Sequence, residues 1–434
     1  MTDRKRVLVF ASKLGYQTRA FNSAAEELGV ALAFVTDRCH RLPDPWNDNA
    51  IAANFETPEV AAQAVLQAQD GKQVDGILAL GDRPAATAAY VAKSLGILYH
   101  HPASVEACRN KLRTREVFRA AGIPVPWFRN LRIDPIPEPA LAGISYPCVL
   151  KPLSLSASQG VVRANNREEF LAGATRLKRL LESAEIRATR EPHLDEMIVE
   201  EYLPGTEIAV EAILTEGELR VLAIFDKPDP LEGPYFEETI YVTPSRLLQT
   251  QQRAVEKSLQ AAVQSLGLTH GPLHAEFRLN NNGVWPLEVA PRPIGGLCAR
   301  SLRFELGDQI IGLEGLLLRH ALGLPGSDAP REAQASGVMM IPVPNSGILE
   351  KVEGVDAATQ VPGVISLEIT ARLHDFIAAW PEGSSYLGFL FAGGATPAEV
   401  EGAIREAHSK LHFTLTPRLP VEHPASHKLS PADI

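Results

Sequence analysis

Short apolar runs alternate with segments of helical spacing along the first hundred residues of the chain. This pattern predicts strands at 6–10, 30–35 and 76–80, and helices at 16–28, 58–69 and 84–95. Strands that alternate with helices favour right-handed crossovers and a parallel sheet. We therefore expect a small Rossmann-like unit. The first strand is not followed by a G-x-G-x-x-G motif, which disfavours a dinucleotide site there.

The rest of the chain predicts two further units of mixed helices and strands. Asn110 is a plausible N-cap for a helix that ends near Ala121. Further strands are expected at 148–151, 161–162, 196–201, 207–214, 219–225, 337–341, 347–352 and 386–392, and helices at 104–108, 167–182, 246–266, 307–322 and 397–410. The expected domains are 1–105, 106–328 and 329–416, followed by a flexible tail at 417–434.

Composition excludes several classes of protein. A length of 434 residues suits about three domains of roughly 150 residues each. A net charge of -10 without a basic stripe argues against nucleic-acid binding as the main activity. No apolar run reaches the ~20 residues that span a bilayer, so we expect no membrane partner. The four cysteines form no C-x-x-C pair, which favours the reducing cytoplasm: Cys39, Cys108, Cys148 and Cys298.

The segment from His274 to Pro293 predicts a hairpin that carries chemistry. We expect Asn281-Asn282-Gly283 to form a three-residue turn with the glycine in the left-handed conformation. That register places Glu276 directly opposite Glu288, where two like charges destabilise a hairpin. A divalent cation such as Mg²⁺ would remove the conflict. Two unrelated surface acids on a solvated hairpin are an equally good interpretation of this pair alone.

Two lysines precede this hairpin in the chain. Lys151 ends an apolar strand, and the loop that follows contains Ser154, Ser156, Ser158, Gln159 and Gly160. Hydroxyls and backbone N–H groups on such a loop can close over phosphates, although the loop is not a Walker motif. A polar hairpin turn is the simpler alternative. Lys111 begins the helix after Asn110, where the helix dipole does not favour a cation unless it reaches an anion.

A strand that breaks at Pro204-Gly205 and then resumes is a candidate adenine site. Adenine needs an exposed backbone edge beside apolar faces, and a strand that stops pairing at a hinge offers one. Ribose hydroxyls need a carboxylate, which Glu200, Glu201 or Glu207 could supply. An ordinary hairpin is the alternative.

These four signals, in this order, resemble the ATP-grasp superfamily over roughly residues 1–415. The resemblance implies an ATP-grasp fold, of mixed α/β and α+β class, with an N-terminal Rossmann-like domain and a C-terminal α+β lid domain. It also implies that ATP phosphates contact Lys111 and Lys151 under the loop at 154–160. Adenine would be held by Glu200, Glu201, Tyr202 and Leu203, and ribose by Glu207. Magnesium would be ligated by Glu276 and Glu288, and the transferring phosphoryl group stabilised by Arg292.

One position departs from the family pattern. Many members carry Asn two residues after the second metal glutamate, where this chain has Ala290. Alanine has no side-chain oxygen, so a second metal would lose a ligand or take water instead. Some carboxylase-type members have a similar Glu-x-Ala-Pro-Arg run, so Ala290 does not by itself imply an inactive enzyme.

Within the superfamily the chain is similar to the L-amino acid ligases, which make dipeptides. The segments that carry this likeness are Asp226-Lys227, 233–238, 271–276, 292–296 and 347–352. The likeness implies an ATP-dependent carboxylate–amine ligase that forms an acyl phosphate and releases ADP and phosphate. Gly295 and Gly296 could present N–H donors to the intermediate. His274 could contact a substrate carboxylate or accept the amine proton, or be purely structural.

Arg300 and Arg303 follow these glycines and are candidates for the carboxylate of the second amino acid, with a surface role as the alternative. The expected partners are small-molecule substrates, and a homodimer would be ordinary for such a family. Two other functions remain open at this point. One is an ATP-grasp carboxylase, or a ligase for a carboxylate that is not an amino acid. The other is a nucleotide-binding protein without turnover, which Ala290 alone favours.

Overall fold

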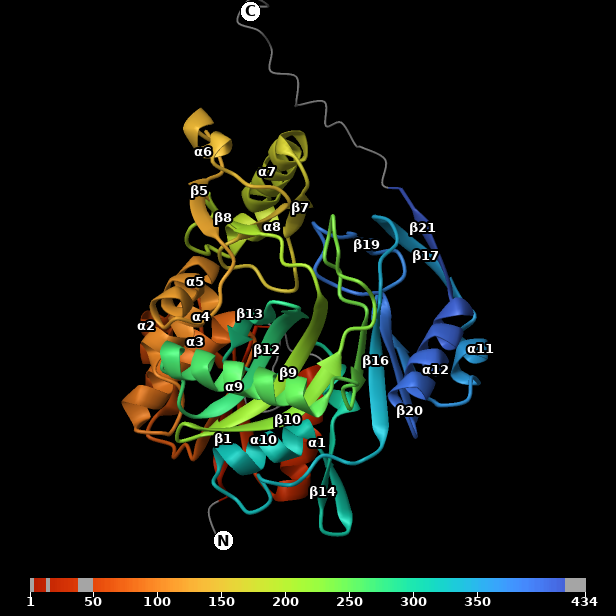
Figure 1. The fold of residues 1–434 in the computed structure, drawn as a ribbon. Helices are drawn as coiled ribbons and strands as arrows, with labels where there is room; N and C mark the ends of the chain where they lie inside the picture. Colours follow the sequence, from red (N-terminus) through yellow and green to blue (C-terminus); the bar gives the residue numbers. More distant parts are fainter. Residues whose placement is uncertain (1–3, 13–15, 38–49, 418–434) are drawn as a thin grey trace, which may run out of the picture.

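A parallel sheet forms the N-terminal part of the computed structural model, which describes residues 4–12, 16–37 and 50–417 (Figure 1). Its strand order is β3-β2-β1-β4, with every pair parallel. The strands are β1 (Arg6–Ala11), β2 (Ala31–Thr36), β3 (Ala50–Ala52) and β4 (Gly76–Leu80), and the helices are α1 (Tyr16–Leu28), α2 (Pro58–Gln69) and α3 (Asp82–Leu95). The predicted Rossmann-like unit is thereby confirmed. The predicted flexible tail lies outside the described residues, apart from residue 417.

A small antiparallel sheet of order β5-β8-β6-β7 follows, and we call it the small sheet. Two helices lead into it, α4 (Pro102–Arg109) and α5 (Lys111–Ala120). Its strands are β5 (Phe128–Arg132), β6 (Cys148–Pro152), β7 (Val162–Ala164) and β8 (Glu196–Glu201), with helices α6 (Glu138–Ala142), α7 (Arg167–Glu182) and α8 (Ala184–Ala188). Phe170, Leu177 and Leu181 of α7 pack on Leu150 and Val199 of the sheet. In Figure 1 this layer stands above the rest of the molecule.

An eight-stranded sheet, which we call the long sheet, runs through the remainder in the order β13-β12-β9-β10-β11-β16-β20-β18. The strands are β9 (Thr206–Thr215), β10 (Glu218–Asp226), β11 (Ile240–Thr243), β12 (Gly271–Asn280), β13 (Gly283–Ala290), β16 (Ala335–Ile341), β18 (Val364–Ile369) and β20 (Gly388–Gly394). Helices α9 (Gln249–Leu266), α10 (Leu313–Ala321) and α12 (Pro397–Ser409) pack against it. Pairing of β11 with β16 carries this sheet across the domain limit expected at residues 328 and 329.

Shorter elements complete the C-terminal part. They are the 3₁₀ turn η1 (Cys298–Ser301), strands β14 (Arg303–Leu306), β15 (Gln309–Gly312), β17 (Gly347–Glu353), β19 (Phe376–Ile377) and β21 (His412–Thr416), and helix α11 (Val355–Thr359). The helix expected at 307–322 begins only at Leu313, because β14 and β15 form a hairpin that turns at Gly307 with φ +60°. Mixed helices and strands around a parallel sheet and a long antiparallel sheet confirm the predicted fold class.

Candidate active site

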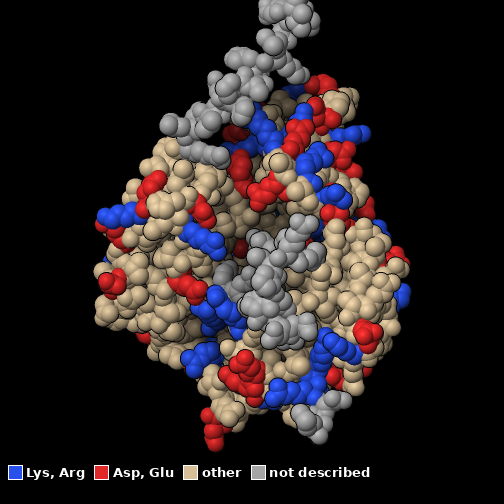
Figure 2. All heavy atoms as spheres, turned by 180° about the vertical axis from the view of Figure 1, so that it is seen from behind, with Lys and Arg blue, Asp and Glu red and all other residues tan. Residues whose placement is uncertain are grey.

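A cavity of about 920 Å³ opens where the N-terminal sheet, the small sheet and the long sheet meet. Its walls include Asp82 after β4, Lys151 at the end of β6, Glu276 on β12, and the segment 384–386 before β20. Apart from Gly160, every residue predicted to bind ATP, Mg²⁺ or the acyl phosphate lines this cavity. Figure 2 shows the molecule hollowed below the upper layer, with acidic and basic side chains around the hollow. Residues that are far apart in the chain therefore face one space.

The hairpin of β12 and β13 places Glu276 opposite Glu288, as predicted, but by a different route. The expected three-residue turn is wrong: Asn280 pairs with Gly283, so only two residues form the turn. A bulge between Glu276 and Phe277 then shifts the register by one residue. This extra residue on β13 is Leu287, and it restores the pairing of Glu276 with Glu288. Gly283 has φ +127°, outside the compact left-handed region that was expected.

The two predicted phosphate lysines lie on the small-sheet side of the cavity. The Asn110 side chain caps α5 by accepting from the Arg113 N–H at 3.0 Å. Lys111 therefore begins the helix, and its Nζ donates to the Leu155 carbonyl at 2.7 Å and lies 3.6 Å from Glu288 Oε2. Lys151 Nζ lies 2.5 Å from Glu200 Oε2. Burial lowers the pKa of Lys151 and Glu200 partly offsets this effect.

The loop at 154–160 is held by the C-terminal part of the chain. Gly160 N–H donates to the Pro381 carbonyl at 2.8 Å, and the Gln159 side chain donates to the Glu382 carbonyl at 2.7 Å. Trp380 Nε1 donates to the Ala157 carbonyl at 3.1 Å. The position of this loop over the cavity therefore depends on residues 380–382.

The segment after β8 joins the small sheet to the long sheet, which is the hinge expected from Pro204-Gly205. The Leu203 carbonyl accepts from Arg278 Nη1 at 2.7 Å, while its N–H has no acceptor among the described residues. The buried Tyr202 ring stacks on Phe236 at 6.5 Å between centroids. Glu201 is exposed at the cavity wall. Apolar rings beside an unpaired backbone N–H suit a flat heteroaromatic base.

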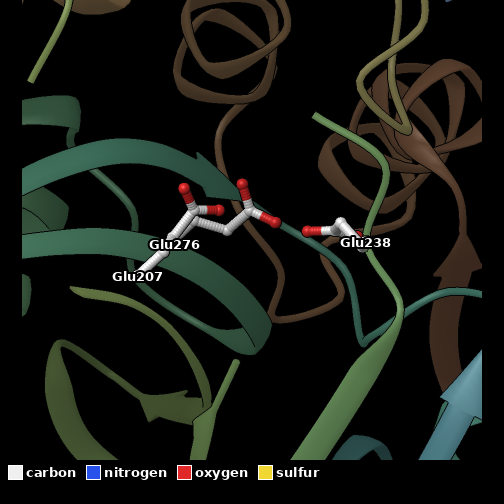
Figure 3. Close-up of side chains that lie close together, drawn as sticks. All are labelled: Glu207, Glu238 and Glu276. Atoms are coloured by element: carbon white, nitrogen blue, oxygen red, sulfur yellow. The ribbon is translucent and has the colours of Figure 1, made fainter. Parts of the chain in front are cut away.

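Three carboxylates point toward one another beside the hairpin, as Figure 3 shows for Glu207, Glu238 and Glu276. One oxygen from each lies within 4.8 Å of the others. Lys227 Nζ lies among them, 2.9 Å from Glu207, 3.1 Å from Glu276 and in contact with Glu238. Glu207, the predicted ribose ligand, also receives a hydrogen bond from Arg278 Nε at 2.9 Å.

Electrostatics differ within this cluster. Burial raises the pKa of Glu238 to about 7. Burial also opposes ionisation of Glu276, but Lys227 and His274 outweigh it and hold the pKa of that carboxyl well below its usual range. The donor set consists of carboxylate oxygens only, and Glu288 faces Glu276 across the hairpin. Hard divalent cations such as Mg²⁺ prefer this chemistry, so these residues fit such an ion.

His274 is buried between two carboxylates. Its Nδ1 contacts Glu211, and its Nε2 lies 3.7 Å from Glu276 Oε1. Burial lowers the pKa of His274, but Glu211 outweighs this effect and the pKa rises to about 9. The ring is therefore an imidazolium at neutral pH. Such a group can hold a substrate carboxylate, whereas it has no free nitrogen with which to accept the amine proton.

Arg292 is oriented by the N-terminal unit. Its Nε lies 2.9 Å from Asp82 Oδ1, and its Nη2 lies 3.2 Å from Asp82 Oδ2. Burial raises the pKa of the Asp82 carboxyl, but Arg292 outweighs burial and lowers it overall. Asp82 begins α3 directly after β4, at the carboxyl end of a parallel strand, where ligands favour binding.

The glycines after Arg292 border the same cavity. Gly296 has φ +63°, and a Cβ there would lie 3.2 Å from the Phe389 ring, so only glycine suits the position. Arg300 and Arg303 do not line the cavity: they pair with Glu368 at 2.7 Å and with Glu332 at 3.1 Å. Their suggested contact with a second substrate is therefore wrong for this geometry. Arg300 lies within η1 and Arg303 begins β14, and both side chains pair with glutamates away from the cavity lining.

Several residues around the site were not assigned a role from the sequence. They are Asp82, Arg115, Glu211, Lys227 and Glu238. Lys227 and Glu238 lie in segments that resemble the L-amino acid ligases, and this resemblance is the sequence feature that could have pointed to them. Asp82 and Glu211 lie far along the chain from the residues they contact, so spacing could not reveal them.

Comparisons with known proteins agree with this geometry. The profile of the ATP-grasp domain matches residues 144–301, that of the ATP-grasp N-terminal domain matches 21–97, and that of the L-amino acid ligase C-terminal domain 2 matches 339–416. An alanine–anticapsin ligase from Bacillus amyloliquefaciens is 28% identical over 338 residues, which cover 68% of this chain and 70% of that protein.

Solved structures show the same likeness. The crystal structure of an L-amino acid ligase from Bacillus licheniformis is 26% identical, has a TM-score of 0.78, and aligns over 96% of this chain and 100% of its own. An ATP complex of a carboxyaminoimidazole ribonucleotide synthase from Aspergillus clavatus shares the fold, at 18% identity, a TM-score of 0.68, and coverage of 94% and 98%. The chain therefore contains an ATP-grasp domain preceded by an ATP-grasp N-terminal domain, and it is similar over almost its whole length to an L-amino acid ligase.

Proposed function

We propose that this protein is an ATP-dependent ligase that joins the carboxylate of one amino acid to the amine of another. The observation that carries the proposal is one cavity that contains two lysines, a facing pair of glutamates and a half-buried arginine. Similarity to the alanine–anticapsin ligase and to the L-amino acid ligase supports the ligase class. Small molecules are accordingly its substrates.

The chemistry proceeds in two transfers. A carboxylate oxygen of the first amino acid attacks the γ-phosphorus of ATP, and ADP leaves, so that an acyl phosphate forms. The amine nitrogen of the second amino acid then attacks the carbonyl carbon and forms the C–N bond. The bond between that carbon and the phosphate oxygen breaks, and phosphate leaves with the electron pair. The protein contributes mainly positioning and neutralisation of charge.

Each part of the cavity has a proposed task. Lys111 and Lys151 bind the phosphates under the loop at 154–160, while Tyr202 and Leu203 border adenine. Glu276 and Glu288 would hold Mg²⁺, which supplies charge neutralisation on the phosphate oxygens. Arg292 stabilises the transferring phosphoryl group, and Gly295 and Gly296 allow close approach of the acyl phosphate to backbone N–H groups.

His274 has one proposed task of the two suggested by the sequence. Its positive charge suits contact with the substrate carboxylate. The amine must lose its proton to another acceptor, such as the departing phosphate. Glu200 takes part in nucleotide binding through Lys151, because its own carboxylate is enclosed by Arg115 and Lys151.

A screen with pools of the twenty amino acids tests the proposal. The protein is incubated with ATP and MgCl₂, and both phosphate release and new masses are followed. Phosphate release with a mass equal to two amino acids minus water is expected. Phosphate release only with bicarbonate would favour a carboxylase, and ATP binding without stimulated hydrolysis would favour a binding protein without turnover.

We also propose that the protein acts in the cytoplasm as a homodimer. Cys108, Cys148 and Cys298 are buried free thiols, which supports the reducing cytoplasm. Among the described helices, none has the length and apolarity that a membrane crossing requires. A homodimer is testable by light scattering on the eluted protein.

A further inference from the structure

Arg115 is a buried cation that contacts Glu200, a residue of the cavity wall. It lies on α5 and is only 1% exposed, one of the largest fully buried side chains in the described part of the chain. A buried guanidinium is costly unless every face is paired. Its partners come from two other elements, β8 of the small sheet and β13 of the long sheet.

The first partner is Glu200, which connects Arg115 to a phosphate lysine. Arg115 Nε lies 2.6 Å from Glu200 Oε1, and Nη2 lies 3.3 Å from Oε2. The same Oε2 lies 2.5 Å from Lys151 Nζ. Burial opposes ionisation of Glu200, but the two cations outweigh it and lower its pKa to about 2. Glu200 is therefore a fixed anion whose orientation is set by Arg115 and passed to Lys151.

The second partner is the Leu287 carbonyl, which accepts from Arg115 Nη1 at 2.9 Å. Leu287 is the extra residue of the β13 bulge, where the ladder of strand hydrogen bonds is interrupted. Without that bulge, the two-residue turn would pair Glu276 with Leu287. Glu288 would then point to the opposite face, because a one-residue slip reverses every side chain.

We propose that Arg115 is a positioning residue that sets two parts of the ATP site at once. Through Glu200 it orients Lys151, and through the Leu287 carbonyl it holds the bulge that turns Glu288 toward Glu276. The inference rests on the proposed ATP and Mg²⁺ roles of Lys151 and Glu288. Arg115 does not itself line the cavity, so it acts only through these residues.

Arg115→Lys and Arg115→Met test this role, with Arg113→Met as the matched control. Arg113 lies on the same helix, but it is exposed and pairs with Glu116 on the surface at 3.2 Å. Loss of a supporting partner behind metal ligands typically costs 10–100-fold, so we expect about that rise in the KM for ATP and in the Mg²⁺ concentration for half-maximal rate. The KM for the amino acids should stay within about twofold, as for Arg113→Met.

A double-mutant cycle with Glu200→Gln separates the two connections. If Arg115 orients Lys151 through Glu200, the effects of Arg115→Lys and Glu200→Gln on the KM for ATP are not additive. The Mg²⁺ dependence should respond to Arg115→Lys and much less to Glu200→Gln, because the Leu287 contact does not pass through Glu200. Additive effects, or an equal loss for all substrates, would reduce Arg115 to a structural residue and overturn the proposal.

Folding and function can be told apart. Circular dichroism and melting temperature show whether each variant is folded, and a folded Arg115→Lys with wild-type constants for ATP and Mg²⁺ overturns the proposal. If both Arg115 variants fail to fold, Glu200→Gln decides alone: an unchanged KM for ATP overturns it. Direct binding of Mg-ATP to each variant tests the role of Arg115 without any need for turnover. A wild-type protein that binds Mg-ATP but makes no dipeptide would refute the proposed function and leave the role of Arg115 testable.

Discussion

Replacing Lys227 with Met should turn the acidic cluster into a site whose stability depends on a divalent cation. Lys227 is buried at 6% exposure and pairs with three carboxylates. Its ion pairs at 2.9 and 3.1 Å each contribute an attraction of about 5.5 kcal/mol at an effective dielectric constant of about 20. Burying the ammonium offsets much of this. Removing one partner of a buried ion pair still costs about 3–5 kcal/mol, which is the expected fall in the free energy of unfolding.

Repulsion among the remaining carboxylates makes this loss specific. Two charges 4.8 Å apart repel by about 3.5 kcal/mol at the same effective dielectric constant. Mg²⁺ can take the place of the ammonium, and at about a hundredfold excess over its Kd it would restore about 2.7 kcal/mol. Urea unfolding in EDTA and in MgCl₂ measures both effects.

Lys178→Met is the control for this experiment. Lys178 is a surface lysine with 38% of its side chain exposed, and it pairs with Asp134 at 2.6 Å and with Glu182 at 3.9 Å. Both partners are exposed, so its loss should change stability by no more than about 0.5 kcal/mol. A Lys227→Met protein as stable as the wild type in EDTA would refute the electrostatic reasoning. If the variant is less stable but Mg²⁺ raises its free energy of unfolding no more than it raises that of the wild type, the cation site is refuted.

Three other predictions follow from the same geometry. Glu288→Gln keeps the shape of the side chain but removes a metal ligand, so phosphate release should fall about a hundredfold or more; an unchanged rate would contradict the metal assignment. Asp82→Asn removes the carboxylate that orients Arg292, so kcat should fall about tenfold with the KM for ATP preserved, and an unaltered kcat would mean that Arg292 needs no such partner. Burial lowers the pKa of His320 from 6.5 to about 4. Between those values the unfolded chain binds a proton that the folded chain does not, so stability should be full above pH 6.5 and fall as the pH drops toward 4. His320→Gln should flatten this part of a melting-temperature profile, and an identical profile would refute the assignment.

Elements with strong local signals were predictable from the sequence. Helices α2 and α7 and strand β4 have the expected bounds, because Pro58, the Asn166 cap and a continuous apolar run act within a few residues. Strand β5 was missed, since its sequence Phe-Arg-Asn-Leu-Arg has no alternation and its side chains are mostly exposed. Its pairing with β8 is decided by a strand about seventy residues away.

The hairpin shows how a local rule can give a correct contact for the wrong reason. A three-residue turn and a two-residue turn followed by a bulge both bring Glu276 opposite Glu288. Turn chemistry alone could not separate them, because the bulge is held by Arg115 from a distant helix. The choice between the two therefore belongs to packing beyond the hairpin.

The family resemblance, the order of the site segments and the chemical groups available for ATP and magnesium could all be recognised in the amino-acid sequence. Which charged groups meet became known from the folded chain: Lys227 lies among three glutamates, Asp82 pairs with Arg292, and Arg115 contacts both Glu200 and Leu287. These contacts join segments separated by tens to hundreds of residues. The residue type fixes the charge and size of each side chain. Which side chains come into contact depends on how the N-terminal sheet, the small sheet and the long sheet pack around one cavity.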